Sequence, residues 1–112
     1  IPAKPPPDLG DPVHFLLMYD LAPDYLERRA EFRDAHLKLA WEAQARGELV
    51  LAGALADPAD HAVLMFSCDN PEPVQLFAAR DPYVTHGLVR AFHVRQWNTV
   101  IGDDAFTPVR PA

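Results

Sequence analysis

The chain has 112 residues, of which 49% are hydrophobic, so it is long and apolar enough to fold around one core and is not a disordered chain. A net charge of −6 argues against the clustered basic surface that nucleic acids require, so we expect no nucleic-acid partner. The one cysteine, Cys68, excludes an internal disulfide and a cysteine-based zinc site, and no apolar run approaches the roughly 18 residues of a membrane span, so we expect no membrane partner.

The two ends of the chain differ in composition from its middle. Residues 1–12 hold five of the twelve prolines, which favour polyproline II structure and predict an N-terminal arm. Residues 103–112 predict a similar C-terminal tail, and we expect the folded domain over residues 13–102. The sequence begins at Ile1 rather than at a methionine, which leaves room for an upstream segment such as a cleaved signal peptide. We nevertheless expect a cytoplasmic protein.

The first half of the domain combines a strand pattern with a helix pattern. Residues 13–19 form a short apolar run without glycine or proline, which predicts a buried strand. Pro23 and Asp24 then open a long helix, in which apolar residues recur at helical spacing. We expect this helix to end near Arg46, because Gly47 is suited to a C-terminal cap.

The next segments predict a hairpin followed by a second helix. Two apolar runs, 48–56 and 61–67, are joined by a turn sequence at 57–60. Residues 69–72 carry a capping side chain, a proline and an acid, which together are typical of a helix start. We expect that helix to end near Arg80, because the following proline disfavours helical geometry. A loop then leads to a last strand over residues 89–99.

This β-α-β-β-α-β order predicts an α+β domain of the ferredoxin-like kind. Right-handed crossovers place the four strands in one antiparallel sheet with both helices on one face. The strands contain consecutive apolar residues rather than an alternating pattern, so both faces of the sheet need cover. A second copy of the sheet is the simplest cover for the face without helices, which predicts a homodimer or a higher homo-oligomer. The alternative is a monomer whose arms fold across that face.

The five histidines show no pattern that points to a metal. None forms a tight metal-binding motif with an accompanying acid, so we expect no metal site. We also expect no organic cofactor, because the chain has neither a phosphate-binding glycine loop nor a dinucleotide fingerprint. His14, His61 and His93 lie in strand patterns and are interpreted as structural residues, and Cys68 is interpreted as a plain buried thiol.

His36 lies in the middle of the first predicted helix and is the leading candidate for chemistry. Arg29 and Arg33 fall on the same helix face, beside an apolar stripe, as expected of a helix edge that meets a cleft. The alternative is a solvated face on which nearby acids pair with the arginines. Those acids are Glu27, Glu31 and Asp34.

Asp81 is the second candidate. A negative side chain at the C-terminus of a helix is electrostatically unfavourable, so Asp81 is expected to have a histidine or arginine partner. His86 follows five residues later and competes with His36 for that role. The alternative is that Asp81 and Pro82 mark only a turn.

Several segments together resemble the YCII-related family, small proteins of the dimeric α/β-barrel group. The matching segments are Arg33-Asp34-Ala35-His36-Leu37, Gly47, Leu51-Ala52-Gly53-Ala54-Leu55, Asp81-Pro82-Tyr83 and the strand through Trp97. The resemblance covers about residues 13–102 and implies a ferredoxin-like fold and a dimer built from facing sheets. It also implies an active-site histidine–aspartate pair, which maps onto His36 and Asp81.

We expect a small-molecule enzyme in which His36 is the general acid or base and Asp81 orients it. Elimination or isomerisation of a small, carboxylated or aromatic metabolite fits this pair, because no activated nucleophile is evident. Arg29 or Arg33 is expected to bind a carboxylate or enolate oxygen, and Tyr83 to donate a hydrogen bond to the ligand. The alternative is a dimeric protein that binds a small molecule without transforming it, or an accessory partner of another protein.

Overall fold

The computed structural model describes residues 12–112, so nearly all of the predicted N-terminal arm lies outside the described residues. Its elements are β1 (Val13–Leu21), α1 (Tyr25–Ala45), β2 (Leu49–Ala54), β3 (His61–Cys68), α2 (Glu72–Arg80), α3 (Pro82–Thr85) and β4 (Val89–Trp97). The sequence predicts all of these except α3, with ends that differ by a few residues. Within residues 12–112, no helix is long and apolar enough to cross a membrane.

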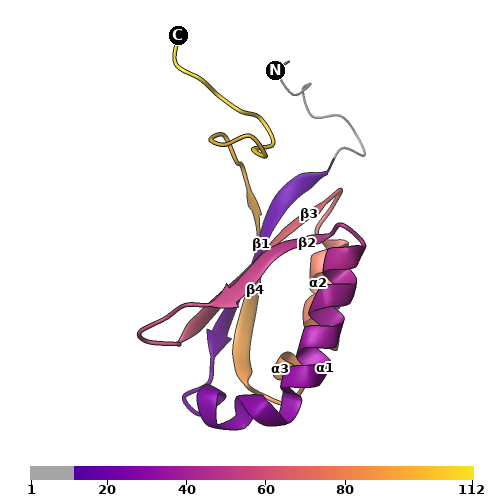
Figure 1. Ribbon diagram of the computed structural model, residues 1–112, viewed down its shortest axis with the longest axis vertical. Helices are drawn as coiled ribbons and strands as arrows, with labels where there is room; N and C mark the ends of the chain where they lie inside the picture. The colour runs from indigo at the N-terminus through magenta and orange to yellow at the C-terminus, as the bar shows by residue number, and fades with distance from the viewer. Residues whose placement is uncertain (1–11) are drawn as a thin grey trace.

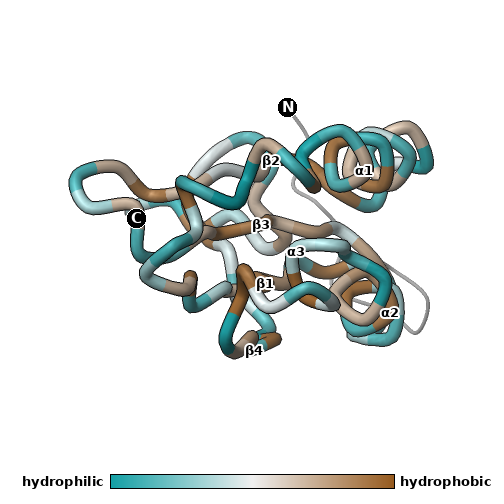
Figure 2. The backbone as a smooth tube through the Cα atoms, turned by 90° about the horizontal axis from the view of Figure 1, so that it is seen from below, coloured by the Kyte–Doolittle hydropathy of each residue, from teal (hydrophilic) through white to brown (hydrophobic). Residues whose placement is uncertain are grey.

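The four strands form one sheet in the order β2-β3-β1-β4 (Figure 1). Every neighbouring pair is antiparallel, and β1 lies in the interior between β3 and β4. Figure 2, a view along the sheet, shows the three helices together on one side of the strands. The predicted α+β, ferredoxin-like fold is therefore confirmed.

The face of the sheet under the helices, called here the covered face, carries the hydrophobic core. Leu17 and Tyr19 of β1 and Phe66 of β3 are almost completely buried there. Phe66 meets Phe77 of α2 edge to face, with 5.4 Å between the ring centroids. Such aromatic pairs add to the free energy gained from burial, so this contact holds α2 against the sheet.

The opposite face, called here the open face, is also apolar at its centre. Leu16 pairs with Met65, and Met18 pairs with Val63, across β1 and β3. Successive side chains of a strand point to opposite faces, so the consecutive apolar residues of β1 supply both faces. These four side chains are only partly buried in the single chain. The prediction of two apolar faces is confirmed, whereas cover by a second copy stays a prediction.

The helix α1 lies over the covered face but buries little of its own surface. Its buried side chains are Tyr25 and Ala43. Several of the large apolar residues that recur at helical spacing in the predicted helix are instead exposed: Leu26, Leu37 and Trp41. The helix ends as predicted, because Gly47 has a φ of +83°, a conformation that glycine adopts without strain. The loose packing of α1 leaves room between this helix and β2.

The segment after α2 corrects the sequence-based expectation of a loop. Asp81 ends α2 and is also the N-cap of α3, where its carboxylate accepts the backbone N–H of Tyr83 at 3.0 Å. Pro82 occupies the first turn of α3, where its missing N–H costs nothing. Proline therefore stops one helix and starts the next, and the carboxylate of Asp81 lies at a favourable helix N-terminus rather than only at an unfavourable C-terminus.

Candidate active site

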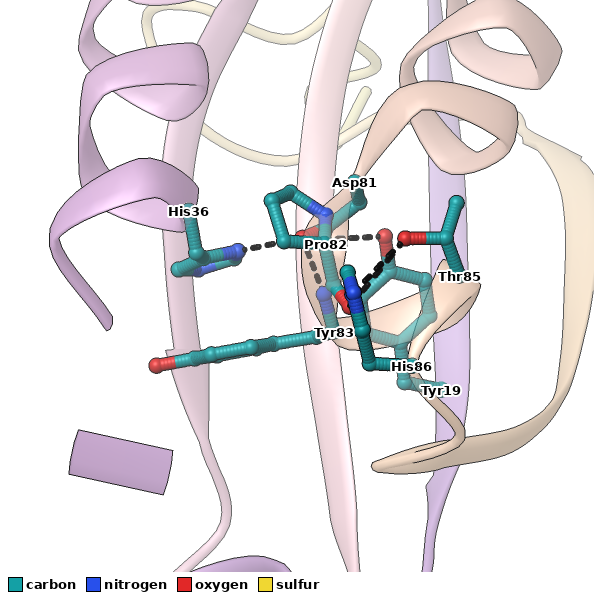
Figure 3. A network of polar contacts seen from close by, with 7 residues as sticks. All are labelled: Tyr19, His36, Asp81, Pro82, Tyr83, Thr85 and His86. Atoms are coloured by element: carbon teal, nitrogen blue, oxygen red, sulfur yellow. Dashed lines mark hydrogen bonds and ion pairs between the residues drawn. The ribbon is translucent and has the colours of Figure 1, made fainter. Parts of the chain in front are cut away.

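The fold brings His36 and Asp81 into contact although 45 positions separate them in the sequence (Figure 3). The Nδ1 atom of His36, from the middle of α1, lies 2.8 Å from Oδ1 of Asp81, at the junction of α2 and α3. Asp81 is fully buried, and the side chain of His36 is 15% exposed. The two residues therefore meet as predicted, in a largely buried position.

Asp81 accepts hydrogen bonds from three directions. Besides His36 and the N–H of Tyr83, the hydroxyl of Tyr19 donates to Oδ2 at 2.7 Å. A carboxylate that accepts from all three requires the proton of a neutral His36 to be on Nδ1. The lone pair of that imidazole is then on Nε2, for which no hydrogen bond is found within residues 12–112.

Tyr19 is a part of this network that the sequence analysis misses. It lies in the apolar run of β1, where a tyrosine is interpreted as core, and its partner Asp81 is 62 positions away. Burial, and then the charge of Asp81 and the hydrogen bond to it, raise the pKa of Tyr19 far above its usual value. The phenol is therefore a permanent donor that holds the carboxylate in place.

Tyr83 fixes the orientation of the His36 ring. The two rings stack in parallel, with 3.9 Å between their centroids and 9° between their planes. Tyr25 meets the ring of Tyr83 edge to face, with 5.7 Å between the two ring centroids. Burial, and then the neighbouring Tyr25, raise the pKa of Tyr83 to about 12, although the charges of Arg33 and Arg29 act in the opposite direction. Tyr83 is therefore a protonated phenol at neutral pH.

His86, the competing partner for Asp81, lies elsewhere. It is exposed, its ring stacks on Phe32 at 4.3 Å, and its Nδ1 lies 3.1 Å from the carbonyl oxygen of Pro82. It makes no contact with the Asp81 carboxylate among those found in the described residues. The partner expected for Asp81 is therefore His36, supplemented by Tyr19.

A cavity of about 380 Å³ lies between α1 and β2, beside this network. Its wall includes every residue predicted to bind or act on a ligand except Asp81, which lies behind His36. Those wall residues are Arg29, Arg33, His36 and Tyr83. Most of the remaining wall is apolar and comes from α1 and from all six residues of β2. Ligand sites in proteins are typically apolar cavities of this kind with a few converging polar groups.

The two arginines of the cavity are not neutralised by the nearby acids of α1. Within residues 12–112, neither Arg29 nor Arg33 forms an ion pair with a carboxylate. The guanidinium of Arg29 lies 5.7 Å from the ring centroid of Tyr25, over the aromatic wall. The interpretation of this helix face as the edge of a cleft is therefore supported over that of a solvated, self-paired face.

The contacts of the side chains also bear on two further kinds of site, a metal centre and a reactive cysteine. No set of three metal-binding side chains with suitable geometry occurs in the described part of the chain. Burial, and then the charge of Glu48, raise the pKa of the Cys68 thiol to about 11, and its Sγ donates to the carbonyl oxygen of Asn70. Cys68 is therefore a buried, protonated thiol, as the sequence analysis predicts.

Comparison with known proteins identifies the family. Residues 13–98 match the profile of the YCII-related domain. The chain belongs to the YCII-related family. The family resemblance found in the sequence is thus confirmed, over almost the same residues. A search of curated proteins gave no significant match.

Two solved structures share the fold of this YCII-related protein. One is the 5-chloro-2-hydroxyhydroquinone dehydrochlorinase TftG of Burkholderia phenoliruptrix AC1100, in complex with 2,5-dihydroxybenzoquinone. It has 21% sequence identity and a TM-score of 0.65, and the match covers 77% of this chain and 94% of that one. The other is a NIPSNAP family protein of Agrobacterium tumefaciens, with 14% identity, a TM-score of 0.53 and coverage of 88% and 99%.

Proposed function

We propose that this protein is an enzyme that eliminates or isomerises a small, carboxylated or aromatic compound, with His36 as the general acid or base. The observation that carries the proposal is the pairing of His36 Nδ1 with a buried carboxylate while the ring itself lines a cavity. A histidine oriented in this way offers Nε2 to a ligand. The similar fold of a dehydrochlorinase, which acts on a chlorinated hydroquinone, supports elimination as the reaction type.

In the proposed reaction, Nε2 of His36 accepts a proton from a carbon or hydroxyl group of the substrate. The electron pair left behind forms a new double bond, and in an elimination the leaving group departs with its own bonding pair. In an isomerisation, the imidazolium returns the proton to another atom of the substrate. Asp81 stabilises the imidazolium throughout, because its side chain is held in place by hydrogen bonds from Tyr19 and from the N–H of Tyr83.

The proposed binding groups complement this chemistry. Arg29 and Arg33 bind the carboxylate or enolate oxygen of the substrate, because they are cationic, line the cavity and have no carboxylate partner in the described residues. Tyr83 donates a hydrogen bond, since its raised pKa keeps the hydroxyl protonated. No step requires a cofactor.

The test is the replacement of His36 by asparagine, with turnover measured against a panel of hydroxylated, halogenated and carboxylated ring compounds. Loss of a general acid or base is expected to lower kcat by about 10²–10⁴-fold. His61→Asn, on the open face, is the matched control and is expected to keep full activity. Activity retained by His36→Asn, with an unchanged unfolding curve, would contradict the proposal.

A protein that only binds its ligand is the second candidate, favoured by the arginine-containing cavity alone. Saturable binding of a ring compound by the wild-type protein, with no change in that compound over days, would support this candidate.

We further propose that the working form is a homodimer in which the open faces of two sheets meet. The partly buried Leu16, Met18, Val63 and Met65 support this, because such apolar surface is rarely left in water. Light scattering is expected to give at least twice the mass of the chain.

A further inference from the structure

The cavity between α1 and β2 is long and runs parallel to α1. Besides Tyr25 at the start of α1, seven residues of this helix line the cavity at helical spacing: Arg29, Arg33, His36, Leu37, Ala40, Trp41 and Gln44. From the first to the last of these, the helix rises roughly 22 Å. This length exceeds what a single six-membered ring needs, so the cavity has room for more than one part of a ligand.

The two halves of this cavity differ in charge. Arg29 and Arg33 lie in the half that precedes His36 along α1, and no aspartate or glutamate contributes to the wall. The protein as a whole carries a net charge of −6, so a cationic pocket is a local exception. A pocket of this kind attracts an anionic group. That group would lie about one helical turn, roughly 5 Å, from the imidazole of His36.

The half of the cavity beyond His36 is open and mostly apolar, with Gln44 as a polar residue at its far end. Leu37, Ala40 and Trp41 line it from α1, and Val50 and Leu51 line it from β2. Four of these five side chains are exposed, with Trp41 at 65% and Leu51 at 72% of their surface. Large apolar side chains gathered at the mouth of a pocket are typical of a surface that a ligand covers.

We propose that the ligand is an elongated organic anion with an apolar alkyl or aryl substituent. Its anionic group binds Arg29 and Arg33, and its substituent lies between Trp41 and Leu51. The position of the reacting atom, next to His36 between these two ends, rests on the proposed function. The two-ended binding does not, because it depends only on charge and apolar contact.

Binding of a graded series of probes tests this inference. The probes are benzoate, biphenyl-4-carboxylate and the uncharged biphenyl-4-carboxamide, and binding is measured by calorimetry and by fluorescence. Trp97→Phe provides the background for fluorescence, because it leaves Trp41 as the only tryptophan. Biphenyl-4-carboxylate is expected to bind about ten- to thirtyfold more tightly than benzoate, as burial of a phenyl ring predicts, and to change the emission of Trp41.

Two substitutions separate the two ends of the ligand. Arg33→Gln is expected to weaken binding of both carboxylates about tenfold, as loss of a charged hydrogen bond predicts, and to leave binding of the carboxamide unchanged. Trp41→Ala is expected to remove most of the advantage of the biphenyl compound over benzoate. The controls are Arg90→Gln and Leu76→Ala, which change exposed side chains outside the cavity and are expected to have no effect.

The outcomes distinguish this inference from the proposed function. Equal affinity for carboxylate and carboxamide, or for benzoate and the biphenyl compound, would overturn the inference even if His36→Asn abolishes turnover. A change in the mass of the protein in solution caused by Trp41→Ala would also overturn the inference, because a second chain would then cover the mouth of the cavity. Conversely, the expected affinities without any turnover by the wild-type protein would leave the inference intact and overturn the proposed enzyme.

Discussion

A histidine contacts an aspartate on each side of the sheet, but the two pairs differ in burial and in their other contacts. On the covered side, His36 meets Asp81 at 2.8 Å, with side chains 15% and 0% exposed. On the open face, His61 Nε2 lies 3.3 Å from Asp20, with side chains 50% and 35% exposed. The second nitrogen of His61 contacts Asp60, whereas that of His36 has no protein partner within residues 12–112. A short histidine–aspartate distance alone is therefore no sign of an active site.

The physical difference is the solvent. Water screens the pair on the open face and competes for its hydrogen bonds, so such pairs contribute little to stability. Asp81 is fully buried, so a donor that it loses is not readily replaced by bulk solvent and the loss has a cost. The comparison can be tested by removing groups from each face in turn.

The largest effect is expected for Asp81→Ala. The substitution removes the N-cap of α3 and leaves the hydroxyl of Tyr19 buried without its acceptor, so the free energy of unfolding is expected to fall by about 3 kcal/mol. Urea denaturation followed by circular dichroism measures this value. Asp81→Asn, which keeps the size of the side chain and one acceptor oxygen, is expected to lose less. Full stability in the alanine variant would show that the buried network is not needed for the fold.

The second largest effect is expected from alkaline pH, which should lower the free energy of unfolding through the tyrosines on the covered side. The pKa of Tyr83 is raised to about 12 and that of Tyr19 is also raised, so between pH 10 and 12 the unfolded chain loses protons that the folded chain keeps. The free energy of unfolding therefore falls as pH rises through this window, by up to about 1.4 kcal/mol per pH unit for each tyrosine.

Phenolate absorbance checks this directly. At pH 11 the folded protein is expected to show fewer ionised tyrosines than the same protein in urea, and Tyr83→Phe is expected to narrow the difference. Identical titration curves for the folded and unfolded chains would contradict the assigned burial.

An intermediate effect is expected for Tyr19→Phe. Loss of one hydrogen bond to a buried carboxylate is expected to cost about 1.5 kcal/mol and to lower turnover about tenfold, because Asp81 is positioned less firmly. His61→Asn, which changes a hydrogen-bonding side chain on the open face that does not contact Asp81, is the control. If both variants have the same turnover, Tyr19 is only a core residue.

The smallest effect is expected on the open face. Asp20→Ala removes the partner of His61 and a more distant contact with His93, and is expected to change the free energy of unfolding by less than about 1 kcal/mol. The change should become smaller still in 1 M salt. A cost as large as that of Asp81→Ala would mean that this face is covered, for example by a second copy of the chain.

The sequence predicts the fold well because its signals are local. Apolar runs, the Gly47 cap and helix-start residues near Asn70 each act within a few positions, and Asn70 Oδ1 does accept the N–H of Glu72 at 2.9 Å. The pairing of His36 with Asp81 is anticipated through the family resemblance and through the need of Asp81 for a partner. Both the resemblance and the position of Asp81 at a helix end can be read from short segments of the sequence.

The parts that the sequence does not reveal depend on distant contacts. Nothing in the apolar run around Tyr19 marks its hydroxyl as a donor to a residue beyond α2. The single turn of α3 is too short for periodicity, and the proline that predicts the end of α2 conceals the start of α3. The exposure of Trp41 is also not visible in the sequence, because apolar residues at helical spacing do not indicate how closely the helix packs on the sheet.

The network around Asp81 also has a consequence for folding during translation. Its donors come from the first strand, the first long helix and the turn at Tyr83, so a nascent chain that has emerged only as far as β3 carries the histidine without its acceptor. The ribosome must release the chain as far as Tyr83 before all three donors and the acceptor are present. A product truncated before Asp81 therefore lacks the carboxylate that His36 contacts.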